Sequence, residues 1–250
     1  SWRIIVPDLA TAWHQQGEPD PDALAPIGTS FRTWSSALTA AAHTRDAEIP
    51  YWQSIVDTDE PALGSRRLDP AIDVAGSAES IDVEFDTHLT EALLTTVPAA
   101  VRSGVDTGLL AGLAMAVADG ARQSASQNNP GQQGAVSTVI HREAHGREEH
   151  AISGGDAVRA DLGRTVGWFT TLFPVRLDAS NDVVATLKTV KEQLLAVPDR
   201  GIGYGMLRYL TDTPELSEGA APQVSFNYLG RSSSTDGGEH SAWLPDHESG

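Results

Sequence analysis

Residues 141–150 read HREAHGREEH, and they follow the apolar run AVSTVI at residues 135–140. A short apolar run that is entered from a Gly/Asn/Gln/Pro loop predicts a buried β-strand. The ten residues after it hold three acids, two arginines and three histidines. Ionisable groups at the mouth of an apolar strand cost free energy unless they are paired, solvated or used in chemistry. The stretch is therefore the first place to look for function.

Three interpretations of this stretch are open on local sequence alone. A metal site is suggested by His141 and His145, but the zinc-protease pattern needs a helix and a glutamate directly after the first histidine. A solvated charge run is the second interpretation. In the third, apolar surroundings let Glu143 both take and return a proton. Arg147 and Glu148 would then form an ion pair that braces the loop.

Composition removes several classes of function. The formal charge of −17 makes nucleic acid and anionic membranes poor partners, because both are polyanions. The chain has no cysteine, and its lysines are Lys188 and Lys191, so thiolate and Schiff-base chemistry have few or no candidates. The absence of a secretory signal and of a long apolar run predicts a cytoplasmic location. The chain opens on core-like sequence without methionine, so we expect it to be cut from a longer polypeptide.

Hydrophobic periodicity predicts alternating helices and strands, and therefore an α/β fold. Residues 1–16 should form a helix with Pro7 near its start. Its apolar stripe would be Trp2, Ile5, Leu9 and Trp13. After an irregular stretch at residues 57–79, alternating Ile81, Val83 and Phe85 predict a half-buried strand. The other expected elements are helices near residues 31–42, 50–56, 88–97 (N-cap Asp86 or Thr87), 106–117 and 183–194, strands at residues 172–177 (an edge strand, because of Pro174) and 224–229, and a loose tail anchored by Trp243.

Three further segments carry weaker signals. Residues 164–174 (RTVGWFTTLFP) predict a core strand with a tight turn at Gly167. Residues 198–205 (PDRGIGYG) lack the glycine spacing and the preceding strand that dinucleotide binding requires, but they permit close backbone approach to a narrow ligand. In residues 226–230 (FNYLG), a regular strand would aim either Asn227 or Tyr228 into a site, because adjacent residues face opposite sides of a sheet. A core tyrosine with a satisfied hydroxyl is the alternative for Tyr228.

Taken together and in this order, EAHGRE (143–148), RTVGWFTTLFP, PDRGIGYG and FNYLG resemble the motifs of the epimerisation domains of nonribosomal peptide synthetases. The opening SWRIIVPDLATAW looks like the segment that follows that family's His-His-x-x-x-Asp-Gly motif. The resemblance implies two chloramphenicol-acetyltransferase-like lobes with a tunnel between them. Residues 1–75 would complete the first lobe, and residues 76–250 would form the second. The reaction implied is inversion, from L to D, of the α-carbon of an aminoacyl or peptidyl thioester on the 4'-phosphopantetheine arm of a carrier protein.

The resemblance also implies roles for single residues. Glu143 falls on the family's catalytic glutamate, and Tyr228 on a tyrosine implicated in the site. Substrate-binding or supporting positions would be Asn227, Arg147, His145, Asp8, Trp168, Gly203 and Tyr204. No metal or bound cofactor is implied, and the expected partners are a peptidyl carrier protein domain, adjacent synthetase domains and the N-terminal part of the same domain. Two features depart from the family pattern: Ala144 replaces a glycine, and the histidine motif is missing, so the chain alone is expected to be inactive.

Two rival functions share this fold or part of it. A condensation domain would perform acyl transfer between two carrier-bound partners, but it would lack EAHGRE and FNYLG. A non-catalytic lobe would only dock a carrier. Carrier proteins and this chain are both acidic, so docking would need a local basic or apolar patch. Arg66 and Arg67 are one candidate for it, and an exposed linker explains them equally well.

Overall fold

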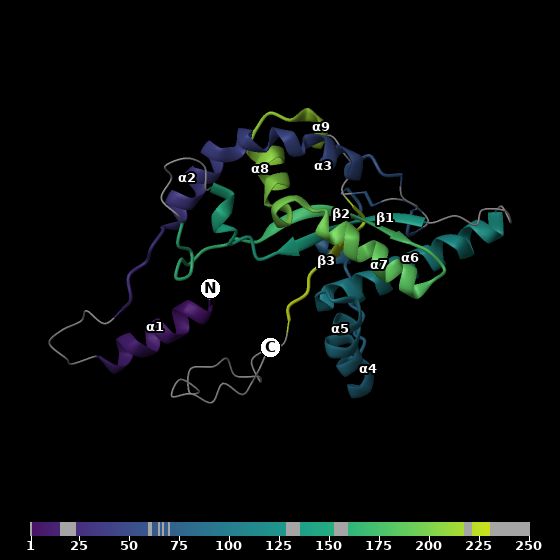
Figure 1. Ribbon diagram of the computed structural model, residues 1–250, viewed down its shortest axis with the longest axis horizontal. Helices are drawn as coiled ribbons and strands as arrows, with labels where there is room; N and C mark the ends of the chain where they lie inside the picture. Colours follow the sequence, from purple (N-terminus) through teal and green to yellow (C-terminus); the bar gives the residue numbers. More distant parts are fainter. Residues whose placement is uncertain are drawn as a thin grey trace.

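The computed structural model describes residues 2–15, 24–59, 62–64, 66, 68–69, 71–128, 136–152, 160–217 and 222–230. Within them, helices surround a three-stranded sheet, which confirms the predicted α/β class (Figure 1). The strands are β1 (Val136–Ala144), β2 (Thr171–Ala179) and β3 (Val224–Phe226). The helices are α1 (Trp2–His14), α2 (Phe31–Ala41), α3 (Ile49–Val56), α4 (Thr87–Glu91), α5 (Val97–Val101), α6 (Val105–Asn128), α7 (Val183–Leu195), α8 (Ile202–Leu210) and α9 (Pro214–Ser217). Shorter turns are η1 (Ala42–Glu48), η2 (Ala75–Ser77), the π-helical η3 (Ala92–Thr96), η4 (Glu149–Ile152) and η5 (Pro198–Gly201).

The sheet has the strand order β2-β1-β3, so β1 lies at its centre. β1 pairs antiparallel with β2 over its whole length, and parallel with β3 from Ile140 to Arg142. Because side chains alternate along a strand, Ile140 and Arg142 face one side of the sheet, whereas His141 and Glu143 face the other. β1 runs to Ala144, four residues past the predicted end, so the first four residues of the charged stretch lie on the strand.

The main core lies on the Ile140 side of the sheet. Trp52 of α3 packs against Phe173 of β2 with ring centroids 6.3 Å apart. Towards the other end of β2, Leu177 belongs to the same core as Val190 of α7. Helices α3, α6, α7 and α8 all contribute to this core. In the view of Figure 1, α3 and α8 lie above the strands, and α6 and α7 lie below them. The fully buried side chains of this core are Trp52, Leu110, Ile140, Phe173, Val175, Leu177, Val190, Leu207 and Leu216.

A second, smaller core joins α2 to the chain before β2 and to α8. Trp34 of α2 lies 6.4 Å from the Phe169 ring, and Leu162, Ile202 and Met206 complete the cluster. The predicted helices at residues 31–42 and 50–56 are confirmed as α2 and α3, and both pack against segments beyond residue 76. The division into lobes at residue 75 stays a prediction.

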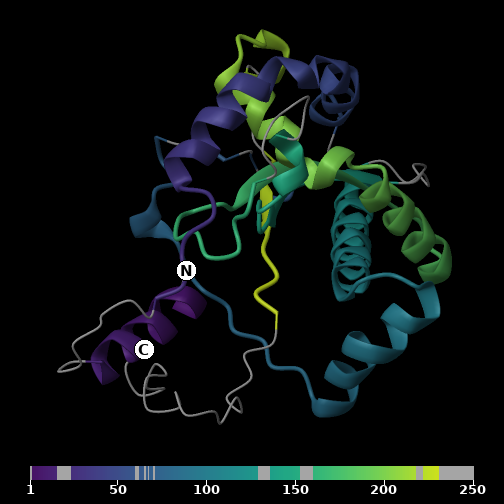
Figure 2. The ribbon, with the colours of Figure 1, turned by 60° about the vertical axis from the view of Figure 1, so that its left-hand side comes forward.

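The first helix differs from its prediction in two ways. Pro7 lies in the interior of α1 instead of near its start. The expected apolar stripe is wrong, because Trp2 and Trp13 are mostly exposed, while Ala10 is the residue that is buried. Figure 2 shows α1 standing to one side of the sheet and its helices. A periodic apolar pattern marks the side that could be buried, but burial needs a packed neighbour.

The predicted strand at residues 81–85 is also wrong. Residues 78–86 have no regular secondary structure, and Ile81 is 90% exposed. Alternation of apolar and polar residues gives a strand one buried face, but a strand also needs a partner for its backbone N–H and C=O groups. The helix that follows does begin as expected, since Asp86 accepts a hydrogen bond from the Leu89 N–H at 2.7 Å.

The remaining elements follow the sequence with smaller changes. The helix at residues 183–194 is confirmed as α7, and Pro174 lies in β2 at the edge of the sheet, as predicted. The last strand is shorter than expected, because β3 ends at Phe226. Trp243 lies outside the described residues. In the described part of the chain, no single helix is long and apolar enough to span a membrane, although residues 87–101 and 105–123 meet that test together across a 99° bend.

Candidate functional site

Glu143 lies on β1, one residue before the strand ends, and its side chain is half-buried. Its partner across the sheet is Leu172 of β2. In the described part of the chain, no hydrogen bond or ion pair reaches the Glu143 carboxylate. The adjacent Arg142, by contrast, points to the other side of the sheet and bonds Asp106 at the start of α6. Glu143 is thus partly withdrawn from water without being committed to a cation among these residues.

His141 lies on the same side of the sheet as Glu143, two residues earlier on β1. Burial, together with the positive charge of Arg208, lowers the pKa of the His141 imidazole below its ordinary value. The ring is therefore neutral at pH 7, and it places no positive charge beside Glu143. His145 lies just beyond the strand and is exposed, so the two histidines share no common environment. No group of three metal-ligating side chains occurs in the described residues.

Arg147 braces the loop after β1, but not in the way that the sequence suggested. Its guanidinium donates hydrogen bonds to the backbone carbonyls of Leu162 and, at 2.9 Å, of Thr165. It also lies 4.1 Å from the centroid of the Phe169 ring. The predicted Arg147–Glu148 ion pair is wrong, because the arginine turns towards the segment before β2. Carbonyl groups in a tight loop need donors, and a guanidinium supplies several at once.

Glu148 is the second glutamate of EAHGRE, and only 5% of it is exposed. Its carboxylate lies 3.4 Å from His145 Nε2, 3.5 Å from Arg200 Nη1 and 3.7 Å from His150 Nδ1. Within the described residues, its Oε1 atom accepts no hydrogen bond. The His145 ring is held by a second contact, since its Nδ1 accepts the Arg147 N–H at 3.0 Å. Glu148 thus ties the loop after β1 to the turn before α8.

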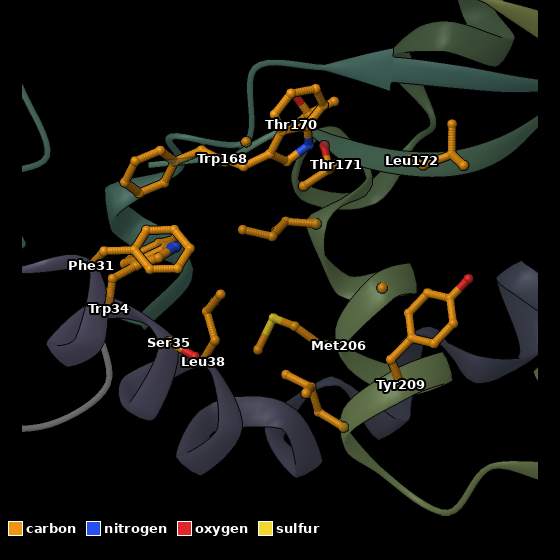
Figure 3. A pocket seen from close by; sticks show the side chains of 15 residues that line it. Phe31, Trp34, Ser35, Leu38, Trp168, Thr170, Thr171, Leu172, Met206 and Tyr209 are labelled. Atoms are coloured by element: carbon orange, nitrogen blue, oxygen red, sulfur yellow. The ribbon is translucent and has the colours of Figure 1, made fainter. Parts of the chain in front are cut away.

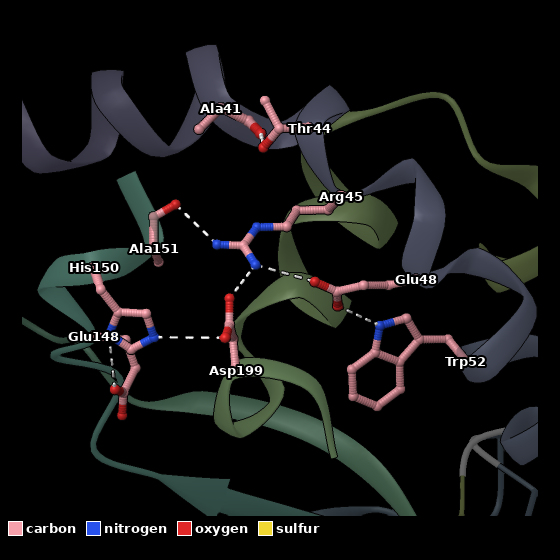
Figure 4. A network of polar contacts seen from close by, with 9 residues as sticks. All are labelled: Ala41, Thr44, Arg45, Glu48, Trp52, Glu148, His150, Ala151 and Asp199. Atoms are coloured by element: carbon pink, nitrogen blue, oxygen red, sulfur yellow. Dashed lines mark hydrogen bonds and ion pairs between the residues drawn. The ribbon is translucent and has the colours of Figure 1, made fainter. Parts of the chain in front are cut away.

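A chain of polar contacts continues from Glu148 through the turn to α3 (Figure 4). His150 Nε2 lies 3.6 Å from Asp199, and Asp199 accepts a hydrogen bond from Arg45. Arg45 also donates to Glu48 at 3.1 Å, and Glu48 accepts the indole N–H of Trp52 at 3.0 Å. The Arg45 bond is the largest cause that lowers the pKa of the Asp199 carboxyl below its ordinary value. The network fixes η5 against η1 and η4.

The glycine-rich turn makes close approaches within the protein. Asp199, Arg200 and Gly201 all have positive φ, which allows the chain to reverse before α8. A Cβ atom at Gly201 would clash with the Phe173 ring, and one at Gly203 would clash with the Glu48 carboxylate. Tyr204 is buried in the main core, where its hydroxyl accepts a hydrogen bond from Arg208. These contacts give Gly203 and Tyr204 a packing role, and their predicted role in substrate binding stays a prediction.

The FNYLG segment leaves the sheet beside the Glu143 end of β1. The last parallel pair is Arg142 with Phe226, so Asn227 and Tyr228 follow where Glu143 and Ala144 continue β1. Asn227 is exposed, and Tyr228 is 41% exposed. Because β3 ends at Phe226, Asn227 and Tyr228 lie outside the strand. Strand alternation therefore does not require their side chains to face opposite sides of the sheet.

Asp8 and Trp168, the remaining predicted site residues, lie in different settings. Asp8 of α1 accepts two hydrogen bonds, at 2.7 and 2.8 Å, from Arg164 of the RTVGWFT segment. Sequence reasoning missed Arg164 as a functional residue, although the arginine heads one of the four motifs. Trp168 is 82% exposed and lies beside an apolar pocket. The carrier-docking candidate Arg66 bonds both oxygens of Asp73, and Arg67 lies outside the described residues.

Comparison with known proteins agrees with this fold and these motifs. Residues 1–246 match the family model described as Condensation domain. The chain is 36% identical over 243 residues to chondramide synthase cmdD of Chondromyces crocatus, and 32% identical over 239 residues to tyrocidine synthase 1 of Brevibacillus parabrevis. Each alignment covers 92% of this chain, but only 6% and 20% of those much longer proteins.

A solved structure of a related domain has the same fold. The crystal structure of the epimerization domain from the third module of tyrocidine synthetase B superposes with a TM-score of 0.72 at 30% sequence identity. The superposition covers 92% of this chain and 49% of that chain, so the protein corresponds to about half of that domain. The fold is the one that the sequence resemblance implied. By the match of the family model over nearly its whole length, the chain belongs to the condensation-domain family.

Proposed function

We propose that this chain takes part in epimerisation, from L to D, of the α-carbon of an aminoacyl or peptidyl thioester that a carrier protein presents. The four motifs support this proposal, and so does the 30% identity to an epimerization domain over 92% of the chain. The family also performs condensation-type acyl transfer, which is the rival activity. The single observation that carries the proposal is the half-buried carboxylate of Glu143 at the end of β1, which is unpaired within the described residues.

Glu143 is suited to act as the base for a carbon acid. The hydrogen next to a thioester carbonyl is weakly acidic, so a carboxylate can remove it only if water is largely excluded. A carboxylate that already accepts bonds from arginine would be too weak a base, and Glu143 accepts none in the described part of the chain.

Inversion also requires that a proton reach the opposite face of the α-carbon. In the epimerisation domains that the sequence resembles, the histidine motif lies before the first residue of this chain and would supply a second acid. Tyr228 is the candidate within the chain, because it follows β3 directly beside the end of β1. Arg147 would act indirectly, by fixing the loop that follows Glu143. The 4'-phosphopantetheine arm of a carrier protein would bring the thioester, and the domain itself would bind no cofactor.

The proposal is tested by α-proton exchange in a synthetase module that carries this chain, with its carrier loaded and the solvent replaced by D₂O. The Glu143→Gln variant should lower the rate of deuterium wash-in by about a thousandfold, because the amide cannot accept the proton. The matched control is Glu192→Gln, which changes an exposed carboxylate on α7 and should leave the rate unaltered. Deuterium wash-in that persists in Glu143→Gln would remove Glu143 from this role. Formation of a new peptide bond without exchange would favour the condensation activity.

A further inference from the structure

An apolar pocket of about 350 Å³ opens between α2, α8 and the chain that leads into β2. Figure 3 shows Phe31, Trp34 and Leu38 of α2 on one side of it, and Met206 and Tyr209 of α8 on another. Trp168 and Thr170 lie above it in that view, and Phe169 also lines it. The volume lies near the lower end of the range for ligand pockets, which suits one group of a ligand better than a whole ligand.

One glycine of the PDRGIGYG segment lines the pocket and has open space beside it. The space beside Gly201 is filled by Phe173, and the space beside Gly203 is filled by Glu48. A Cβ atom at Gly205 would meet no atom of the described residues within 4 Å, and Gly205 lines the pocket. The first two glycines therefore serve packing, whereas the third leaves an unoccupied volume that a side chain could have filled.

The wall of the pocket selects against charge. None of the described residues that line it carries an ionisable acid or base except the Tyr209 phenol. Its polar side chains are Ser35, Thr170, Thr171, Tyr209 and the indoles of Trp34 and Trp168. A carboxylate or ammonium group in this volume would lose its water without gaining a partner of opposite charge, which is unfavourable. Aliphatic and aromatic groups would instead bury their surface against Trp34, Leu38 and Met206.

The pocket begins next to the Glu143 end of β1. Thr171 and Leu172 both line it, and they pair across the sheet with Ala144 and Glu143. Antiparallel partners lie about 4.5–5.5 Å apart between their Cα atoms. Gly146, three residues after Glu143, lines the pocket as well. An acyl group whose α-carbon lies at Glu143 would therefore have this volume within reach of its side chain.

From these observations we propose that the pocket is the subsite for an apolar side chain of the carrier-bound acyl group, and that Gly205 sets the size of side chain that it takes. This inference rests on the proposed function for the identity of the ligand. The substrate class is an aminoacyl or peptidyl group with a leucine-like or phenylalanine-like residue at the carbon that is inverted. Acidic and basic residues are excluded from it.

The inference is tested first by binding, which needs no turnover. Leucyl-, phenylalanyl- and aspartyl-pantetheine amides, which do not hydrolyse like thioesters, are titrated against the chain, and quenching of tryptophan fluorescence reports occupancy beside Trp34 and Trp168. The leucyl and phenylalanyl probes should bind at least about tenfold more tightly than the aspartyl probe, as one or two buried methylenes already give factors of this size. Equal affinity for all three probes would overturn the inference.

A size series at Gly205 then asks whether this glycine sets the limit. Gly205→Ala and Gly205→Leu fill the pocket stepwise without a backbone clash, and either side chain suits a helix better than glycine. The leucine variant should lose at least about tenfold in affinity for the phenylalanyl probe. The matched control is Gly112→Leu on α6, where a side chain also meets open space, and it should bind like the parent chain. Unchanged binding in Gly205→Leu would overturn the inference.

The same variants separate this inference from the proposed function. In the module that carries the chain, Gly205→Leu should slow α-proton exchange on a phenylalanyl carrier at least about tenfold more than on an alanyl carrier. Exchange that is lowered equally for both would overturn the subsite. If the binding order holds but the parent module exchanges no α-proton, the proposed function fails and the apolar subsite stands.

Discussion

Glu143 and Glu148 are the first and last residues of EAHGRE, and they have the same side chain in different surroundings. Glu143 is half-buried on β1, and no described group bonds its carboxylate. Glu148 is almost fully buried, with two histidines and an arginine within 3.7 Å. Both glutamates belong to the same short motif. The difference shows that one motif can hold one carboxylate without a cationic partner among the described residues and a second that is surrounded by cationic and imidazole groups.

Like Glu148, the other residues at the end of the motif make contacts that hold the loop. Arg147 bonds two backbone carbonyls, and Gly146 has a φ of +65° with the Phe169 carbonyl against its Cα. These contacts hold the loop that follows Glu143 without engaging the Glu143 carboxylate. We therefore expect substitutions at Glu143 to act on chemistry, and substitutions at Arg147, Glu148 and Asp199 to act mainly on stability.

The largest loss of stability is expected for Arg147→Ala. The variant should lower the free energy of unfolding by about 3 kcal/mol, because charged hydrogen bonds to buried carbonyls and a cation over an aromatic ring are each worth about 1–3 kcal/mol. Denaturant unfolding measures the change. Arg147→Lys should recover only part of it, since an ammonium cannot reproduce the two-pronged geometry. A loss below about 1 kcal/mol would show that Arg147 does not stabilise the loop that follows Glu143.

A smaller loss is expected for Glu148→Gln, and it is the sharpest test of the comparison. Replacing the buried carboxylate leaves Arg200, His145 and His150 without their shared anion, at a cost of about 2 kcal/mol, less than for a fully buried pair because all three are exposed. Glu143→Gln should leave the free energy of unfolding unchanged or slightly higher. The comparison breaks if the two variants show the reverse order in unfolding experiments.

The smallest effect is expected for Asp199→Asn, and it should depend on pH. The bond from Arg45 lowers the pKa of the Asp199 carboxyl in the folded protein, so the folded state holds fewer protons than the unfolded state in acid. The stabilisation is therefore present above the unfolded pKa of about 4 and is lost as the pH falls through the folded value. Thermal unfolding should show the variant below the parent at pH 7, and the difference should shrink as the pH falls below about 4. A difference that does not change as the pH is lowered would assign the effect to packing.

The outcome of the sequence predictions depends on whether a pattern needs distant partners. Local signals were confirmed: Asp86 caps the helix after it, Pro174 lies in an edge strand, and α2, α3 and α7 begin near their predicted residues. Patterns that require a neighbour failed more often. Residues 81–85 alternate as a strand should, and α1 has an apolar stripe, yet Ile81 and Trp2 remain exposed. The Arg147–Glu148 pair failed for the same reason, since each side chain found a partner from another segment.

The amino-acid sequence by itself determined the family, because four ordered motifs are a linear property, and it determined Glu143 as the candidate base. The position of Glu143 on the side of β1 opposite to Ile140 came from the structure, because the sequence predicted that the strand ends at residue 140 and β1 runs to Ala144. Only the tertiary structure decided which of the two motif glutamates meets cations among the described residues, that Asp8 meets Arg164 across 156 residues, and that Gly205 opens a pocket while Gly201 and Gly203 are filled. Those outcomes depend on which segments pack together, and the energies of such contacts are set by distance and burial that no linear pattern contains.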